Sequence, residues 1–229
     1  MTGWNWGENK HVDTSRLTED LTRDEPEAII RTLAMMTYNP AIARVLERDG
    51  VRKFESLMVE TVPGLASVAT QAGFDIFHSE TCERITLTFK TNKGVALSWG
   101  QAQKPFNVFL KVYVAWAKLP GAAIAERLQP FLHVPLDSVL MGFIKERFPQ
   151  EYRQHMQRVC AKFVSDAAAQ HPNLAQDRTT RWLVDNVELS LMPRPVYVAW
   201  QEFLRFIHPD RPILLDTIWA TQRNLVAGA

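Results

Sequence analysis

Apolar residues recur every three to four positions along most of the chain, which is the pattern of amphipathic helices. In residues 138–148 these positions include Leu140, Phe143 and Ile144, and in residues 149–169 they include Met156 and Val159. Residues 103–118 and 196–207 also favour helix. The pattern predicts roughly eight to ten helices and therefore a mostly α fold.

One segment departs from this pattern. Residues 85–89 read Ile-Thr-Leu-Thr-Phe, an alternation of apolar and polar residues that is typical of a β-strand. Asn92-Lys93-Gly94 follows as a turn signal, and the chain resumes with apolar residues in 95–99. The sequence therefore predicts a small β-hairpin over residues 85–99, beside the helices.

The domain organisation follows from where the helical pattern begins. Residues 1–24 are polar and are interpreted as an N-terminal arm. Asp24-Glu25-Pro26 then resembles a helix start, with acidic residues and a proline in the first turn. We expect residues 25–229 to form a single helical domain with its functional cleft around residues 99–141.

Composition excludes several classes of protein. The chain has 229 residues, 46% of them hydrophobic, a net charge of +1 and two cysteines, so neither a disordered chain nor a disulfide scaffold is expected. No apolar run approaches the ~18 residues that a membrane helix needs. The first residues do not resemble a signal peptide. We expect a monomeric cytoplasmic protein that needs neither a membrane nor a cofactor.

The segment after Pro105 contains the most unusual feature of the chain. It is apolar nearly all round, yet Lys104, Asn107 and Lys111 follow one another at helical spacing on one stripe. Two cations and an amide on a core helix are costly unless they are paired or face a cleft. Pro105 favours the first helical turn, which would place Lys104 at a helix N-terminus.

A lysine in that position can be interpreted in two ways. The positive end of the helix dipole and partial burial both disfavour the ammonium form, and a neutral amine is the nucleophile of Schiff-base chemistry. The alternative is a lysine at a helix end that extends its ammonium into water.

Asp137 is the second candidate. It lies in Pro-Leu-Asp-Ser just before an apolar helix, where an aspartate caps the helix, projects a carboxylate into a cleft, or does both. His133 lies four positions earlier, but Pro135 argues against a helical metal-binding pair. No spacing of cysteine, histidine or acidic residues predicts a metal site.

These residues resemble the helix-hairpin-helix DNA glycosylases, most of all the archaeal 8-oxoguanine type. The resemblance lies in Gln103-Lys104, in Lys111 and in Val134-Pro135-Leu136-Asp137, with Asp137 33 positions after Lys104. The family's Leu-Pro-Gly-x-Gly hairpin before the lysine is missing, and Trp99-Gly100-Gln101-Ala102 stands in its place. The pattern also resembles bacterial glycosylase-like proteins of phage defence, which remove modified cytosines.

The resemblance implies a helix-hairpin-helix-like fold and an enzyme that flips a modified base out of double-stranded DNA and excises it. Lys104 and Asp137 would be catalytic, with or without strand cleavage. Stacking and base contacts would come from a pocket formed by Trp99, Gln101, Gln103, Asn107, Lys111 and His133, with Phe106 and Trp116 as further aromatic candidates. The backbone phosphates would be held by Lys145, Arg147 and Arg153, and further along by Arg158 and Lys162.

Two alternatives remain open at this point. In one, the chain is a helical nucleic-acid-binding protein without catalysis, and Lys104 and Lys111 hold phosphates. In the other it is a metal-dependent nuclease that uses His133 and Asp137.

Overall fold

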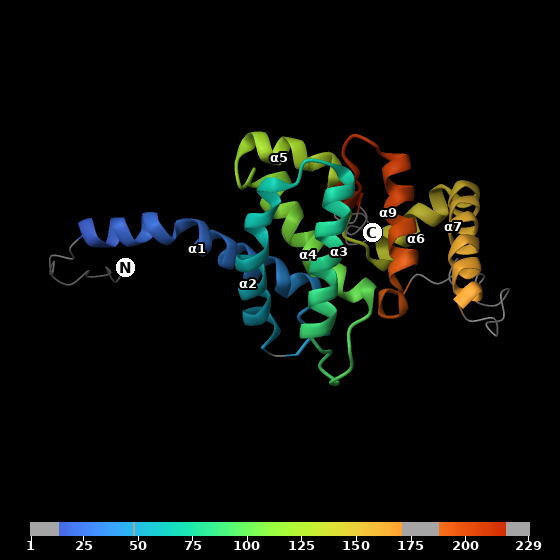
Figure 1. The fold of residues 1–229 in the computed structure, drawn as a ribbon, viewed down its shortest axis with the longest axis horizontal. Helices are drawn as coiled ribbons and strands as arrows, with labels where there is room; N and C mark the ends of the chain where they lie inside the picture. Colours follow the sequence, from blue (N-terminus) through green and yellow to red (C-terminus); the bar gives the residue numbers. More distant parts are fainter. Residues whose placement is uncertain (1–13, 48, 171–187, 219–229) are drawn as a thin grey trace, which may run out of the picture.

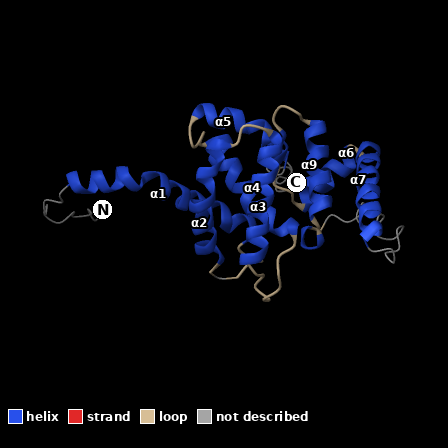
Figure 2. Ribbon diagram, viewed as in Figure 1, coloured by secondary structure: helices blue, strands red, loops and turns tan. Residues whose placement is uncertain are grey.

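The computed structural model describes residues 14–47, 49–170 and 188–218, which form helices joined by loops (Figures 1 and 2). The α-helices are α1 (Thr14–Ile42), α2 (Gly50–Thr61), α3 (Gln71–Thr88), α4 (Trp99–Leu110), α5 (Ala122–Leu128), α6 (Ser138–Arg147), α7 (Pro149–Gln170) and α9 (Arg194–Ile207). Shorter helical segments are η1 (Val62–Ser67), η2 (Lys111–Trp116), η3 (Gln129–Phe131), η4 (Leu189–Leu191) and η5 (Pro212–Asp216). Within those ranges there is no β-strand, and the predicted mostly α fold is confirmed.

The predicted β-hairpin is wrong. Residues 85–88 form the last turn of α3. Two isolated bridges follow, one between Lys90 and Ala96, closed by a turn at Gly94, and one between Thr91 and Leu46. The buried positions Phe74, Cys82 and Ile85 keep the helical period to the end of α3. Leu87, which the alternation placed beside Ile85 on the buried face, is 86% exposed. The helical period over the whole segment therefore overrides a local alternation of five residues.

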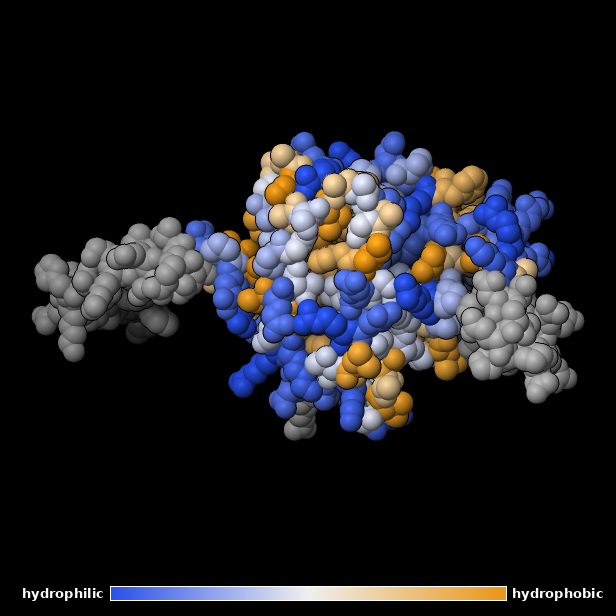
Figure 3. All heavy atoms as spheres, in the orientation of Figure 1, coloured by the Kyte–Doolittle hydropathy of each residue, from blue (hydrophilic) through white to orange (hydrophobic). Residues whose placement is uncertain are grey.

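The apolar side chains gather in two clusters. The first lies among α1 to α5 and includes Phe54, Phe106 and Phe109, and the second lies among α6, α7 and α9 and includes Trp200 and Phe203. Trp99, the first residue of α4, packs against both clusters. Figure 1 shows α3 and α4 in the middle of the molecule, with α9, α6 and α7 on one side and α2 and α1 on the other. On the face in Figure 3, exposed apolar residues are scattered among hydrophilic ones.

The start of α4 is fixed by a close contact with η4. Ser98 caps the helix by accepting from the Gln101 amide at 3.1 Å and donates its own hydroxyl to the Leu189 carbonyl at 2.6 Å. The Gly100 amide donates to the Met192 carbonyl at 3.2 Å. A side chain at position 100 would overlap the Leu189 carbonyl oxygen, which explains the glycine.

Two predicted helix starts are wrong. α4 begins at Trp99, so Lys104 lies in the second turn rather than at the N-terminus, and Pro105 lies inside the helix. The argument from the helix dipole therefore does not apply to Lys104. α1 begins at Thr14, so the part of the proposed arm from residue 14 onward is helical. Among the described helices, none is long and apolar enough to cross a membrane.

Candidate functional site

The structure brings Lys104 and Asp137 together. Asp137 is the N-cap of α6: its Oδ1 accepts from the Leu140 amide at 2.8 Å. Its Oδ2 lies 3.5 Å from the Lys104 ammonium, an ion pair too long for a strong hydrogen bond. The two side chains are 20% and 11% exposed, so the pair is mostly buried but reachable. Asp137 thus both caps a helix and faces the lysine, which is the combined interpretation of the three given above.

A second charged pair lies beside the first. The Lys111 ammonium is paired with the Asp216 carboxylate of η5, and it also lies 4.7 Å from the centre of the Trp116 ring. Burial raises the pKa of Asp216, and Asp137 raises it further, while Lys111 and Lys104 act in the opposite direction. The charges of all four residues therefore interact, and we call Lys104, Lys111, Asp137 and Asp216 the Lys104 site.

Two neighbouring side chains of α4, Gln103 and Asn107, are neutral and fully buried. The Asn107 side-chain amide donates to Gln103 Oε1 at 2.6 Å and to the Tyr197 hydroxyl at 2.9 Å, and it lies 3.3 Å from the Val134 carbonyl. Its oxygen lies 2.7 Å from His78 Nε2. Gln103 and Asn107 are 0% exposed, so the prediction that they face an open base pocket is wrong.

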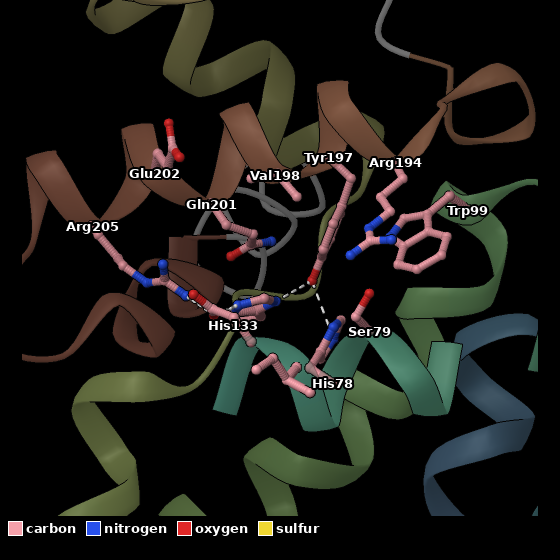
Figure 4. A pocket seen from close by; sticks show the side chains of 12 residues that line it. His78, Ser79, Trp99, His133, Arg194, Tyr197, Val198, Gln201, Glu202 and Arg205 are labelled. Carbon is pink, nitrogen blue, oxygen red and sulfur yellow. Dashed lines mark hydrogen bonds and ion pairs between the residues drawn. The ribbon is translucent and has the colours of Figure 1, made fainter. Parts of the chain in front are cut away.

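The same network continues to an acidic side chain. The Tyr197 hydroxyl lies 2.7 Å from His133 Nδ1, and His133 Nε2 lies 2.8 Å from Asp75 Oδ1. Asp75 is also paired with Arg205 at 2.9 Å. We call Gln103, Asn107, His78, Tyr197, His133 and Asp75 the α4 network (Figure 4 shows its His78–Tyr197–His133 part).

The direction of each hydrogen bond in the network follows from Asp75. An ionised carboxylate only accepts, so His133 donates from Nε2, and its Nδ1 accepts from Tyr197. Tyr197 then accepts from Asn107, and Asn107 accepts through its oxygen from His78 Nε2, which also lies 3.2 Å from the Tyr197 hydroxyl and donates in its direction. This leaves His78 Nδ1 as the acceptor for the Cys82 thiol at 3.7 Å. A single set of tautomers therefore satisfies the chain from Asp75 to Cys82.

Burial keeps both histidines neutral. It lowers the pKa of His133 to about 4 and that of His78 well below 6.5, against the opposing effects of Asp75 and Asn107. Burial alone would raise the pKa of Asp75, but the hydrogen bond from His133 and the charge of Arg205 lower it to about 2. Asp75 therefore stays ionised while the histidines stay uncharged.

His133 does not join Asp137 as a metal-binding pair. Both of its ring nitrogens have partners, Tyr197 and Asp75, whereas Asp137 is bonded to the Leu140 amide and paired with Lys104. Within the described residues, no group of three histidine, cysteine or acidic side chains is placed to hold a metal ion. The geometry thus gives the nuclease alternative no site at these two residues.

The remaining predicted base-pocket residues lie in different places. Gln101 is held in the capping box of α4, and Phe106 is fully buried in the first cluster. Trp99 and His133 line a cavity of about 240 Å³ between α3 and α9, whose described lining does not include Lys104 or Asp137. Trp116 is largely exposed next to Lys111.

The predicted phosphate-binding residues lie on α6 and α7. Arg147 and Arg153 are exposed, and Lys145 lies 5.4 Å from the centre of the Tyr152 ring. Further along α7, Arg158 and Lys162 are also exposed. Their phosphate-binding role remains a prediction.

Sequence reasoning missed Asp216 and half of the α4 network. Asp216 lies 105 positions after Lys111, and nothing in its local sequence pairs it with a lysine. His78, Tyr197 and Asp75 were also missed. His78 could have been found from its place on the apolar stripe of α3, between Phe74 and Cys82, where a buried imidazole requires hydrogen-bond partners.

Comparisons with family models, with curated proteins and with solved structures find no match.

Proposed function

We propose that the protein is a DNA glycosylase that excises a modified base from double-stranded DNA, with Lys104 as nucleophile and Asp137 as the catalytic carboxylate. The observation that carries the proposal is the Lys104–Asp137 pair, two residues 33 positions apart in sequence whose charged atoms lie 3.5 Å from each other in a mostly buried site. An amine next to a carboxylate in such a site is suited to attack on an electrophilic sugar carbon.

In the proposed reaction Lys104 is the nucleophile, and Asp137 transfers the proton and stabilises charge. Lys104 must first lose a proton, and the Asp137 carboxylate is near enough to accept it through a small movement or one water molecule. The neutral amine then attacks the sugar C1′, the glycosidic bond breaks, and the base leaves with the bonding electrons and takes up a proton. Asp137 passes the proton that it took from Lys104 to the leaving base, and its carboxylate, negative again, stabilises the positive charge that develops on the sugar.

The anchoring of Asp137 supports this role. One carboxylate oxygen is held by the Leu140 amide, and the other is directed at Lys104, so the acid does not have to reorient during the reaction. Lys111 differs, because the Asp216 carboxylate is bonded to its ammonium directly. Lys104 is therefore the better candidate for the amine that reacts.

Borohydride trapping tests the proposal. The protein is incubated with duplex DNA containing modified cytosines or oxidised purines, and borohydride is added to reduce any Schiff base between lysine and sugar. We expect released base and a covalent adduct with the parent protein. We expect neither with Lys104→Ala, while Lys111→Ala keeps a detectable adduct.

Matched controls separate catalysis from binding. Lys53→Ala removes an exposed lysine of α2 and should react like the parent. DNA that is bound by the parent but stays chemically intact would replace the proposal with a non-catalytic nucleic-acid-binding protein. An adduct that survives Lys104→Ala and is lost with Lys111→Ala would assign the nucleophile to Lys111.

A further inference from the structure

The cavity between α3 and α9 has properties that the proposed function does not use. Its volume is about 240 Å³, somewhat below the roughly 300–1,000 Å³ of pockets that hold drug-sized ligands. The described lining includes none of the four residues of the Lys104 site. A small ligand could therefore occupy it independently of the chemistry at Lys104.

Buried polar atoms without partners are concentrated at this cavity. Among the residues that the structure describes, five buried side-chain nitrogen or oxygen atoms have no hydrogen-bond partner. Three of them, Ser79 Oγ, Trp99 Nε1 and Arg205 Nε, belong to residues that line the cavity. Leaving one such group unsatisfied costs about 1–3 kcal/mol, so three around one cavity suggest that something other than the protein satisfies them.

The three unsatisfied groups can all donate hydrogen bonds. The indole and guanidinium nitrogens only donate, and the hydroxyl can do so. Ser79 is 8% exposed, and in Figure 4 its hydroxyl points from α3 toward the space below α9 that Trp99 and Arg194 border. Arg205 stands at the opposite end of the same cavity. The complement of this lining is a ligand with several acceptor oxygens.

Arg194 supplies positive charge at the end near Ser79. Its guanidinium lies 5.2 Å from the centre of the Trp99 ring. It is otherwise held by an ion pair with Glu83 in which both side chains are 53% exposed, and such pairs contribute little. The Arg194 guanidinium is therefore free to turn toward an anion bound at Ser79 and Trp99.

The cavity also has an apolar edge. Ile76 of α3 and Val198 of α9 line it and are both exposed, although they are large apolar side chains. Of the two carboxylates in the described lining, Asp75 is paired with Arg205 and bonded to His133, and Glu202, half exposed to solvent, lies 3.9 Å from His155. A ligand with an anionic head and a short apolar body fits these surroundings better than a bare inorganic ion.

We propose that the cavity between α3 and α9 binds a small organic oxyanion, a carboxylate or a phosphate monoester. Its oxygen atoms accept hydrogen bonds from Ser79, Trp99 and Arg194, and its apolar part lies against Ile76 and Val198. The site is separate from the Lys104 site, and its occupation requires no DNA.

Titration followed by NMR tests the proposal. The probes are benzoate, phenyl phosphate and the neutral amide benzamide, added to the full chain at concentrations up to millimolar. The signal is the indole N–H resonance of Trp99, assigned by its loss in Trp99→Phe. We expect benzoate or phenyl phosphate to shift it in a saturable way, and the comparison of these two identifies the preferred head group. We expect benzamide to bind at least about tenfold more weakly.

Variants distinguish a ligand group from a structural one. Ser79→Ala should weaken anion binding by about tenfold or more, while its melting temperature stays at or above that of the parent, because the hydroxyl has no partner to lose. Thr81→Val is the matched control on α3, since the Thr81 hydroxyl donates to the Phe77 carbonyl. It should leave anion binding unchanged.

Three results would overturn the proposal. They are the absence of a saturable shift with both anions, an affinity for benzamide equal to that for the better-bound anion, and unchanged anion affinity in Ser79→Ala. None of these results bears on borohydride trapping at Lys104, so the two proposals fail separately.

Discussion

Two polar regions lie along helix α4 and differ in charge and in burial. In the α4 network, Gln103 and Asn107 are sealed among neutral partners, and every hydrogen bond has a definite direction. In the Lys104 site, the side chains of Lys104 and Lys111 keep some exposure and are paired with carboxylates. Neutral amides can be buried if they are fully bonded, whereas ammonium groups on the same helix must stay near a carboxylate and water. The first region is therefore suited to holding the fold together, and the second to reacting.

Removing the carboxylate from the Lys104 site should have the largest effect. Asp137→Asn keeps a good helix cap but removes the negative charge beside Lys104. We expect base release to fall by several orders of magnitude, since each ~1.4 kcal/mol of barrier is tenfold. Single-turnover base release and a melting curve check this.

Two further measurements on Asp137→Asn show whether the loss of activity comes from the chemistry rather than from the fold or from DNA binding. The melting temperature of Asp137→Asn should stay within a few degrees of the parent, and DNA binding should persist. An active Asp137→Asn enzyme would reduce Asp137 to a helix cap. Asp137→Ser, which also caps, should behave like the asparagine variant.

Breaking the α4 network should affect stability instead. Asn107→Leu leaves Gln103, His78 and Tyr197 with unmet hydrogen bonds inside the protein. We expect a loss of about 3–5 kcal/mol in the free energy of unfolding. At roughly 2–4 °C per kcal/mol this lowers the melting temperature by about 6–20 °C.

The control for this variant is Thr81→Val, which removes a buried hydroxyl outside the network. If Asn107→Leu were as stable as the control, the network would not be holding the two apolar clusters together. Urea unfolding of both variants gives the comparison.

Lowering the pH should change the contributions of the two regions to the free energy of unfolding in opposite directions. The pKa of His133 is about 4 in the folded chain against 6.5 unfolded, so between these values the unfolded chain binds the extra proton. The free energy of unfolding should therefore fall from pH 7 to pH 5, by about 2 kcal/mol for this residue. The lowered pKa values of His78 and His155 act in the same direction. The pKa of Asp75 is about 2 in the folded chain, so this residue lowers the free energy of unfolding only when the pH falls below its ordinary pKa of 3.8.

Asp216 opposes this trend. Because its pKa is raised, the folded chain binds the proton first, and this residue gains stability as the pH falls toward 3.8. Urea unfolding at a series of pH values measures the sum. A stability that is flat or rising from pH 7 to pH 5 would contradict neutral buried histidines.

The smallest effect is expected for the second charged pair. Burial disfavours the Asp216 carboxylate even with Lys111 beside it, so replacing both by neutral residues should cost little. We expect the double variant Lys111→Met/Asp216→Asn to lie within about 1 kcal/mol of the parent, and Asp216→Asn alone to be less stable than the double variant. A double variant that is the least stable of the series would show that the pair itself is strongly stabilising.

The resemblance to DNA glycosylases predicted that Lys104 and Asp137 share one site, and their charged atoms lie 3.5 Å apart. The residues alone predicted only that a lysine on an apolar helix must be paired or face a cleft. The pairing of Asp216 with Lys111 could not be predicted from the sequence, because a contact between residues 105 positions apart depends on the tertiary fold. The amides of Gln103 and Asn107 were expected to contact a base, and instead His78, Tyr197 and each other satisfy them.

Two local errors have identifiable causes. Pro105 is typical of a helix start, but Ser98 and Gln101 have the spacing of a capping box, and the helix begins at Trp99, six residues before the proline. The alternation in residues 85–89 was read over five positions, too short a window to reveal the helical period of α3.

The wide turn that follows α4 affects how the chain tolerates changes in length. Residues Lys111–Trp116 form a π-helix, in which the Ala117 amide reaches back five residues to the Val112 carbonyl at 2.9 Å. Residues five apart therefore lie above one another there, and this brings the Trp116 ring to the Lys111 ammonium. Removing one residue, for instance Val114, would let this turn close as an ordinary α-helix, in which the tryptophan follows Lys111 by four positions and so stays on the same face. A single-residue deletion in this turn should thus shorten the chain while keeping the tryptophan beside the charged site and leaving α4 and its cap in place.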